Sequence, residues 1–238
     1  MIWLETLVDA ARVETHLRDR RLDRLANAGS TGPVCSARRR MDNSHFFAYL
    51  YRLRLIERWS LMRNTLRESA AEHSFHVALL THALCTIARE VFGKQVDTPR
   101  AVTLALFHDV TEVITGDIPT PVKHHNPGIL SAMREIESLA AERLLGMVPQ
   151  ELHQTYAPLI DHEGASAEDA EALQFVKAAD KLDAYLKCVT ELAAGNREFA
   201  VAKRQIEEPL RASPIPEVQY FLERFTPSFE KTLDEITE

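Results

Sequence analysis

The sequence has few residues that break helices and no pattern that marks a strand. Its 238 residues include only 8 glycines and 11 prolines. No segment shows the alternation of apolar and polar residues that a half-buried strand requires. Alanine, leucine, glutamate and arginine are abundant, and these residues favour helices. The chain is long enough for one large domain. We therefore predict an all-α fold, a single bundle of six to eight helices.

Other absences exclude several classes of protein. The three cysteines (Cys35, Cys85 and Cys188) are far apart and form no Cys-x-x-Cys pair, which predicts reduced thiols and no disulfide framework. No apolar run approaches the ~20 residues of a membrane span, and the N-terminus has no signal-peptide core. The formal charge of −7 argues against non-specific binding to nucleic acid or to anionic membranes. We expect a cytoplasmic protein with neither a nucleic-acid nor a membrane partner.

The character of the chain changes near residue 40. A break rich in small residues and glycine at 27–33 is followed by the basic cluster 38–40. From residue 44 onward the helical pattern is nearly continuous. We therefore expect residues 1–40 to be an N-terminal extension, poorly ordered or a loose helix, and residues 41–238 to form the folded domain.

Start signals place the helices of that domain. Ser69 and Glu72 have the spacing of a capping box, and prolines 99, 149 and 216 suit first helical positions. We expect helices over about 44–59, 69–93, 98–116, 129–147, 149–160, 166–194, 197–211 and 216–236. The proline-rich stretch 116–128 is predicted to be a long loop, and such loops are often functional.

The most informative feature is the doublet His108-Asp109 within the apolar run 105–110. Burial would remove hydration from both side chains, and buried charges are rarely left without a partner or a metal. Imidazole nitrogen and carboxylate oxygen are both ligands for transition metals. On a continuous helix, Glu112 would lie one turn beyond His108 on the same face.

Two further residues are candidate ligands for the same ion. His73 falls in the first turn of the preceding helix, although His76 could take its place. Asp180 interrupts the apolar helical stripe 176–182. Two nitrogens and two oxygens suit manganese, cobalt, nickel or iron, with zinc or magnesium also allowed. Such an ion can polarise a phosphoryl oxygen and activate water.

The order His73, His108-Asp109, Asp180 resembles the H…HD…D signature of the HD-domain metal-dependent phosphohydrolases. Longer blocks resemble, more specifically, the bacterial 5′-deoxynucleotidases of the YfbR type. These blocks are SHFFAYL at 44–50, LIERWSLMRN at 55–64, EHS at 72–74, TGDIPTPVK at 115–123 and AYLKC at 184–188. The resemblance covers about residues 41–238, and residues 1–40 have no counterpart in it.

The resemblance implies an HD-domain bundle that hydrolyses deoxyribonucleoside 5′-monophosphates to deoxynucleoside and phosphate, with a metal-activated water attacking phosphorus. It implies a homodimer with one divalent ion per subunit, cobalt being favoured and manganese or copper being substitutes. The implied metal ligands are His73, His108, Asp109 and Asp180. The implied catalytic residues are Glu112, Asp117 and Arg58. The implied substrate-binding residues are Arg58, Trp59, His73, Asp109, Asp117, Ile118, Pro119, Thr120 and Asp180.

Alternatives remain at this level. The pair His124-His125 departs from the family pattern and could recruit a second metal. Another HD phosphohydrolase activity, on a triphosphate, a cyclic dinucleotide or an alarmone, would suit such a second ion. A catalytically silent helical regulator is a third reading. The intact Glu112, Asp117 and Arg58 argue against it, because a silent descendant need not retain them.

Overall fold

The computed structural model describes residues 43–123, 125–161 and 166–238. Within these ranges the regular structure is helical, apart from one isolated antiparallel bridge between Glu57 and Ser69. The prediction of an all-α fold is confirmed. The predictions for residues 1–40 and for His124 concern positions outside the described ranges. None of the described helices combines the length and the apolar character needed to cross a bilayer.

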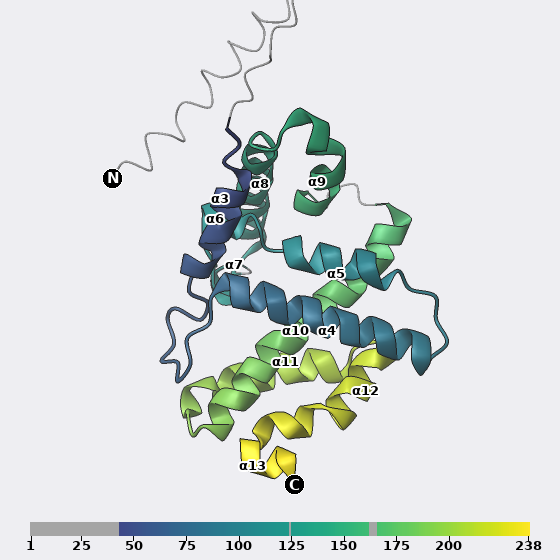
Figure 1. The fold of residues 1–238 in the computed structure, drawn as a ribbon. Coiled ribbons are helices and arrows are strands. Elements are labelled where there is room, and N and C mark those ends of the chain that lie inside the picture. Colours follow the sequence, from purple (N-terminus) through teal and green to yellow (C-terminus); the bar gives the residue numbers. More distant parts are fainter. Residues whose placement is uncertain (1–42, 124, 162–165) are drawn as a thin grey trace, which may run out of the picture. The chain divides into compact units, whose positions relative to one another are not determined.

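The helices follow one another closely along the chain (Figure 1). The α-helices are α3 (Phe46–Leu50), α4 (Ala70–Glu90), α5 (Thr98–Phe107), α6 (Glu112–Thr115), α7 (Thr120–Lys123), α8 (Pro127–Leu145), α9 (His153–Ile160), α10 (Ala167–Ala193), α11 (Ala200–Arg211), α12 (Pro216–Arg224) and α13 (Leu233–Thr237). The 3-10 helices are η1 (Tyr51–Leu55), η2 (Gln150–Leu152), η3 (Arg197–Phe199) and η4 (Thr226–Glu230).

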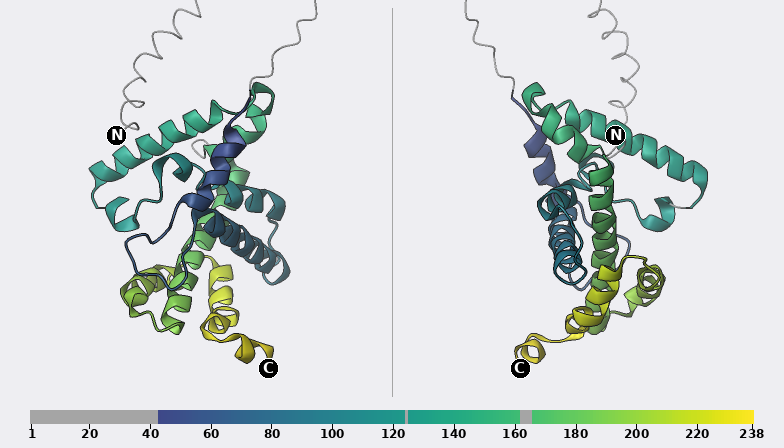
Figure 2. Two further views of the ribbon diagram at one scale, coloured as in Figure 1. Left: turned by 60° about the vertical axis from the view of Figure 1, so that its left-hand side comes forward. Right: turned by 90° about the vertical axis from the view of Figure 1, so that its right-hand side faces the viewer.

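Three helices form the frame on which the site is built. Helices α4, α5 and α10 pack against one another, and α11 and α12 cover the same core (Figure 1). This core is made of fully buried aliphatic side chains such as Leu84, Leu104 and Leu182. Figure 2 shows α8 at one end of this region and the C-terminal helices at the other. Interlocked apolar faces hold the three helices rigidly relative to one another.

A second, smaller core lies beneath α3 and η1. Phe46 and Leu53 pack there with Val110 and with Leu144 of α8. Phe107 contacts both cores from the end of α5. The residues that follow Phe107 are therefore held between two packed clusters, which fixes their position.

The predicted helix 98–116 is broken, and the break falls at the His-Asp doublet. Helix α5 ends at Phe107, His108 is its C-cap, and α6 begins only at Glu112. His108 Nδ1 lies 2.8 Å from the Ala105 carbonyl oxygen, and the following backbone hydrogen bonds span three residues instead of four. This tighter winding turns the doublet out of the helical register.

Two further helices are shorter than predicted. The first ends with η1 at Leu55, because the chain then runs extended beside Ser69, with Arg58 N donating to Glu68 O at 2.9 Å. The last is interrupted after α12, where Pro227 has no backbone N–H to donate. Conversely, the predicted loop 116–128 contains the short helix α7.

Candidate metal centre

The capping box at the start of α4 sets the position of His73. Ser69 accepts a hydrogen bond from Glu72 N, and the Glu72 carboxylate accepts one from Ser69 N at 2.7 Å. This confirms the predicted helix start and the place of His73 in its first turn. The His73 side chain is fully buried, so the helix end presents an imidazole to the interior of the protein.

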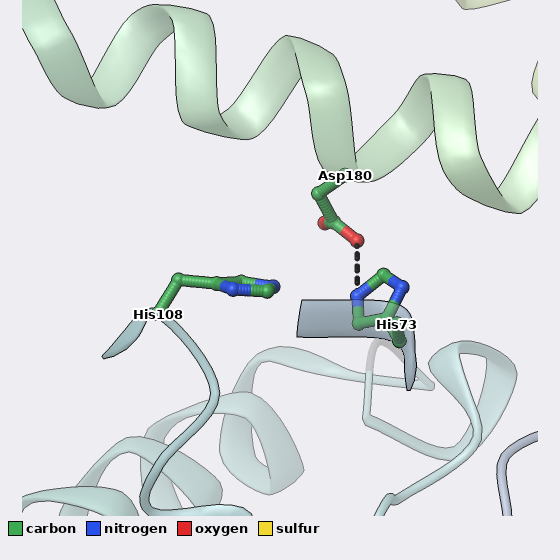
Figure 3. A group of neighbouring side chains, drawn as sticks. All are labelled: His73, His108 and Asp180. Atoms are coloured by element: carbon green, nitrogen blue, oxygen red, sulfur yellow. Dashed lines mark ion pairs between the residues drawn. The ribbon is translucent and has the colours of Figure 1, made fainter. Parts of the chain in front are cut away.

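Figure 3 shows the side chains of His73, His108 and Asp180 converging there, and Asp109 lies beside them. His73 Nε2 lies 3.2 Å from Asp180 Oδ1 of α10 and 3.4 Å from Asp109 Oδ2. His108 Nε2 lies 3.1 Å from Asp109 Oδ2. The ligand atoms of His73, His108 and Asp180 are all within 4.8 Å of one another. The four predicted ligands are therefore brought together.

The polar atoms of this cluster fit a divalent cation. His73 Nε2 and His108 Nε2 are both buried, and neither makes a hydrogen bond within the described part of the chain. Burial opposes protonation of His73, but the carboxylates of Asp109, Asp180 and Asp183 outweigh it and hold the His73 pKa well above its ordinary value. Such a surplus of negative charge around two imidazoles calls for a cation. Imidazole nitrogens and carboxylate oxygens are suitable ligands.

A fifth residue, Asp183, completes the surroundings of His73. Its Oδ2 lies 2.6 Å from His73 Nδ1, on the side of the ring opposite to Asp180. Its Oδ1 lies 3.4 Å from Nδ1 of the half-exposed His76. The structure therefore selects His73 over His76 for the cluster. Sequence reasoning missed Asp183, although its spacing of three residues from Asp180 places both on one helix face.

Arg58 provides a positive charge beside the cluster. Its side chain is only 12% exposed, its Nε donates to Glu68 Oε1 at 3.0 Å, and its Nη1 lies 3.7 Å from Asp109 Oδ2. Burial acts to lower the Arg58 pKa, but the surrounding carboxylates, with Asp109 foremost, raise it. Glu68, which sequence reasoning also missed, holds the Arg58 guanidinium in place. A fixed guanidinium fork suits the recognition of a phosphate.

Trp59 adopts an uncommon backbone conformation. Its φ of 54° makes it the one non-glycine residue with positive φ among those described, a conformation that costs about 1–2 kcal/mol. Its ring packs on Phe199 with centroids 5.4 Å apart, and Asn64 Nδ2 donates to the Trp59 carbonyl at 3.2 Å. Its buried Nε1 has no hydrogen-bond partner in the described ranges. The strained turn holds the indole next to Arg58.

Glu112 is a partly buried carboxyl group near the cluster with a strongly raised pKa. Burial, with repulsion from Asp109 and Asp117, raises the pKa of Glu112 to about 8. A carboxyl group with this pKa holds a proton near neutral pH and can donate it. Glu112 also begins α6, past the break in the helix, so it is not on a shared helix face with His108 as predicted.

The remaining predicted residues flank this group. Asp117 is close enough to influence the proton affinities of both Arg58 and Glu112. The residues Ile118, Pro119 and Thr120 connect α6 to the start of α7 and are partly or fully exposed. Lys123 pairs with Glu137 of α8 at 2.6 Å, and His125 is exposed.

The all-α fold is shared by solved structures of HD-domain phosphohydrolases. An HD-domain phosphohydrolase from Listeria innocua has a TM-score of 0.66 and 24% identity, covering 78% of this chain and 88% of that one. An HD phosphohydrolase of cyanophage S-2L has a TM-score of 0.53 and 23% identity, covering 76% of this chain and 96% of that one.

Sequence comparison defines the family more closely. The model of the YfbR-like 5′-deoxynucleotidases matches residues 45–229, and the chain belongs to this family. The 5′-deoxynucleotidase YfbR of Shigella boydii is 50% identical over 198 residues, 83% of this chain and 98% of that protein. A 5′-deoxynucleotidase of Vibrio vulnificus is 47% identical over 197 residues, which are 83% of this chain and 100% of that protein. The resemblance inferred from the sequence is confirmed.

Proposed function

We propose that this protein is a metal-dependent 5′-deoxynucleotidase, which hydrolyses deoxyribonucleoside 5′-monophosphates to deoxynucleoside and phosphate. The observation that carries the proposal is the convergence of two buried imidazole Nε2 atoms with Asp109 and Asp180, beside the buried guanidinium of Arg58. Membership of the YfbR-like family supports the substrate class. The cyanophage relative of the same fold was solved bound to dA and one catalytic zinc ion.

In this proposal His73, His108, Asp109 and Asp180 hold the ion. A bound divalent ion polarises a phosphoryl oxygen and lowers the pKa of a coordinated water. Arg58 binds the phosphate, because its guanidinium is already fixed by Glu68 and faces Asp109. The carboxyl group of Glu112, whose burial favours the protonated form, donates its proton to the leaving 5′ oxygen. Asp117 assists by raising the pKa of Glu112.

Substrate selection rests on the residues around Arg58. The indole of Trp59, held against Phe199, limits the space at the sugar 2′ position and so disfavours a ribonucleotide. A steric filter of this kind is worth about 1–3 kcal/mol. Residues 117–120 line the substrate between α6 and α7 in this proposal. No base-reading role is assigned to any of them, so we expect several bases to be accepted.

Finer properties are also proposed. Cobalt is the favoured ion, with manganese or copper as substitutes, as the family resemblance implies; a donor set of two nitrogens and two oxygens is compatible with these ions. The protein acts in the cytoplasm as a homodimer that binds neither nucleic acid nor membrane. Exposed apolar side chains at Phe47, Tyr51 and Leu55, spaced four residues apart, offer one surface for a second subunit.

A substrate and metal panel tests the proposal. Phosphate release is measured from deoxyribonucleoside and ribonucleoside 5′-monophosphates, and from the matching triphosphates, with cobalt, manganese, magnesium or EDTA. We expect deoxyribonucleoside monophosphates to be preferred and EDTA to abolish turnover. Activity that survives EDTA, or cleavage of triphosphates alone, would contradict the proposal.

A further inference from the structure

Asp183 contacts a candidate metal ligand on the side away from the ion. The His73 ring lies between two carboxylates of α10, with Nε2 toward Asp180 and Nδ1 toward Asp183 at 2.6 Å. Both Asp183 and His73 are buried. A hydrogen bond this short, made without competition from water, leaves the ring little freedom to rotate.

The geometry points to Asp183 as a positioning residue for the metal centre, a role that rests on the proposed function. With Asp183 Oδ2 accepting from Nδ1–H, the other nitrogen, Nε2, is the one available to a cation, and it faces Asp109 and Asp180. Carboxylates that bind the far nitrogen of a ligating histidine fix its tautomer and orientation. His76 supports Asp183 in turn, through the 3.4 Å contact of its Nδ1 with Asp183 Oδ1.

The same neighbourhood could instead be read as a second cation site. The ligand atoms of Glu68, His76 and Asp183 lie within 4.8 Å of one another. Both carboxylates already have partners, because Glu68 accepts from Arg58 and Asp183 contacts His73. A cation there would compete with both contacts. The positioning role therefore accounts for the cluster better, and metal stoichiometry separates the two readings.

Zinc affinity of the full chain, measured by calorimetry with zinc alone, tests the role. We expect Asp183→Ala to weaken zinc binding about 10- to 100-fold. Asp183→Asn, whose amide oxygen can still accept from Nδ1–H, should recover part of that loss. His76→Gln should have a smaller effect than either. Glu217→Gln is the matched control, since Glu217 is also a fully buried carboxylate but pairs with Lys94 beyond the far end of α4. It should leave zinc affinity unchanged.

A measurement on the unsubstituted protein keeps the test valid if the Asp183 variants fail to fold. In nitrogen-15 histidine spectra of the zinc-loaded chain, His73 should carry its proton on Nδ1 and none on Nε2. The opposite tautomer would overturn the inference, as would unchanged zinc affinity in Asp183→Ala. Binding of two zinc ions, reduced to one in His76→Gln, would also overturn it. Lack of turnover together with the expected zinc affinities would instead contradict the proposed function.

Discussion

Single residues divide the proposed chemistry between holding an ion and moving a proton. Asp109 contacts both imidazoles and Arg58. Burial would raise the pKa of Asp109, but His108 and His73 outweigh it and hold that pKa well below its usual value. Glu112, three residues further on, has a pKa raised to about 8. Two neighbouring carboxyl groups with opposite shifts are suited to different roles.

Substitution of the two carboxyl groups should separate these roles. We expect Asp109→Ala to abolish metal binding and turnover together. Glu112→Gln should retain the metal and lower kcat by about 10²- to 10⁴-fold, the usual size of a general acid contribution. Metal affinity by calorimetry and rates of phosphate release check both. Full activity in either variant would contradict the assigned role.

The pH dependence of kcat should report the protonation state of Glu112. The donor form of Glu112 is present below its pKa of about 8 and is lost above it, and a bound cation moves that pKa downward. We therefore expect kcat to fall on the alkaline side of a midpoint at or below pH 8, and Glu112→Gln to lack this fall. A rate that instead rises through this range would identify Glu112 as a base.

The indole of Trp59 should set the preference for deoxyribonucleotides. We expect Trp59→Ala to reduce the ratio of kcat/KM for deoxyribo- over ribonucleoside monophosphates by about 10- to 200-fold, the range of a steric filter. The measurement is the two kcat/KM values for one base. An unchanged ratio would remove Trp59 from substrate selection, and Phe92→Ala, which alters an exposed aromatic residue just beyond the far end of α4, is the control.

At the level of elements, α10 holds the loop that carries Arg58 and Trp59. Glu191 accepts hydrogen bonds from Thr65 N and Oγ1 at 2.9 and 2.6 Å and from Asn196 Nδ2 at 2.8 Å, and it pairs with Lys187 at 2.6 Å. Lys187 also donates to Leu66 O. One helix therefore positions both the proposed metal ligand Asp180 and the loop that carries Arg58.

These contacts of Glu191 should make the free energy of unfolding depend on pH. Burial would raise the pKa of Glu191, but its hydrogen bonds, led by Lys187, lower it from 4.5 to about 2. A depressed folded-state pKa gives stability that is complete above pH 4.5 and lost as the pH falls toward 2. We expect Glu191→Gln to lower the free energy of unfolding by about 3 kcal/mol at pH 7, and the difference to shrink below pH 4.5.

Denaturant unfolding of both proteins at several pH values measures this effect. Glu207→Gln provides the control, because Glu207 pairs with Arg211 near the surface of α11 and such pairs contribute about 0–1 kcal/mol. The loss of unfolding free energy in Glu191→Gln could be no larger than that of the control, or could be independent of pH. Either result would mean that the Glu191 contacts do not hold the loop.

At the scale of the whole molecule, the family relationship concerns residues 45–229. The described core begins at Phe46, which is 1% exposed. We expect a chain that begins at Met41 to keep the thermal stability and the phosphate release of the full chain. Thermal unfolding followed by circular dichroism, with parallel assays, checks this. A marked loss of either would assign a structural or catalytic part to residues 1–40.

Much of the fold and the ligand set could be predicted because their signals are local. The capping box at Ser69 and the helices α4, α8 and α10 follow from residues close together in the sequence. The break after Phe107 could not be predicted in this way, because the apolar pattern continues through it. It depends on two separate cores that meet at Phe107. The extended backbone at Arg58 likewise depends on pairing with residues 68–70, which no periodicity reveals.

By itself, the sequence determined the helical class of the chain and, through its family resemblance, pointed to the four proposed ligands, since periodicity, caps and motifs are carried by neighbouring residues. Only the tertiary structure decided which groups surround those ligands. Asp183 contacts His73 across 110 residues of chain, and Glu68 contacts Arg58 across 10. Glu191 contacts Thr65 across 126 residues. Such contacts, and the proton affinities they set, exist only once packed helices exclude water and bring distant charges together.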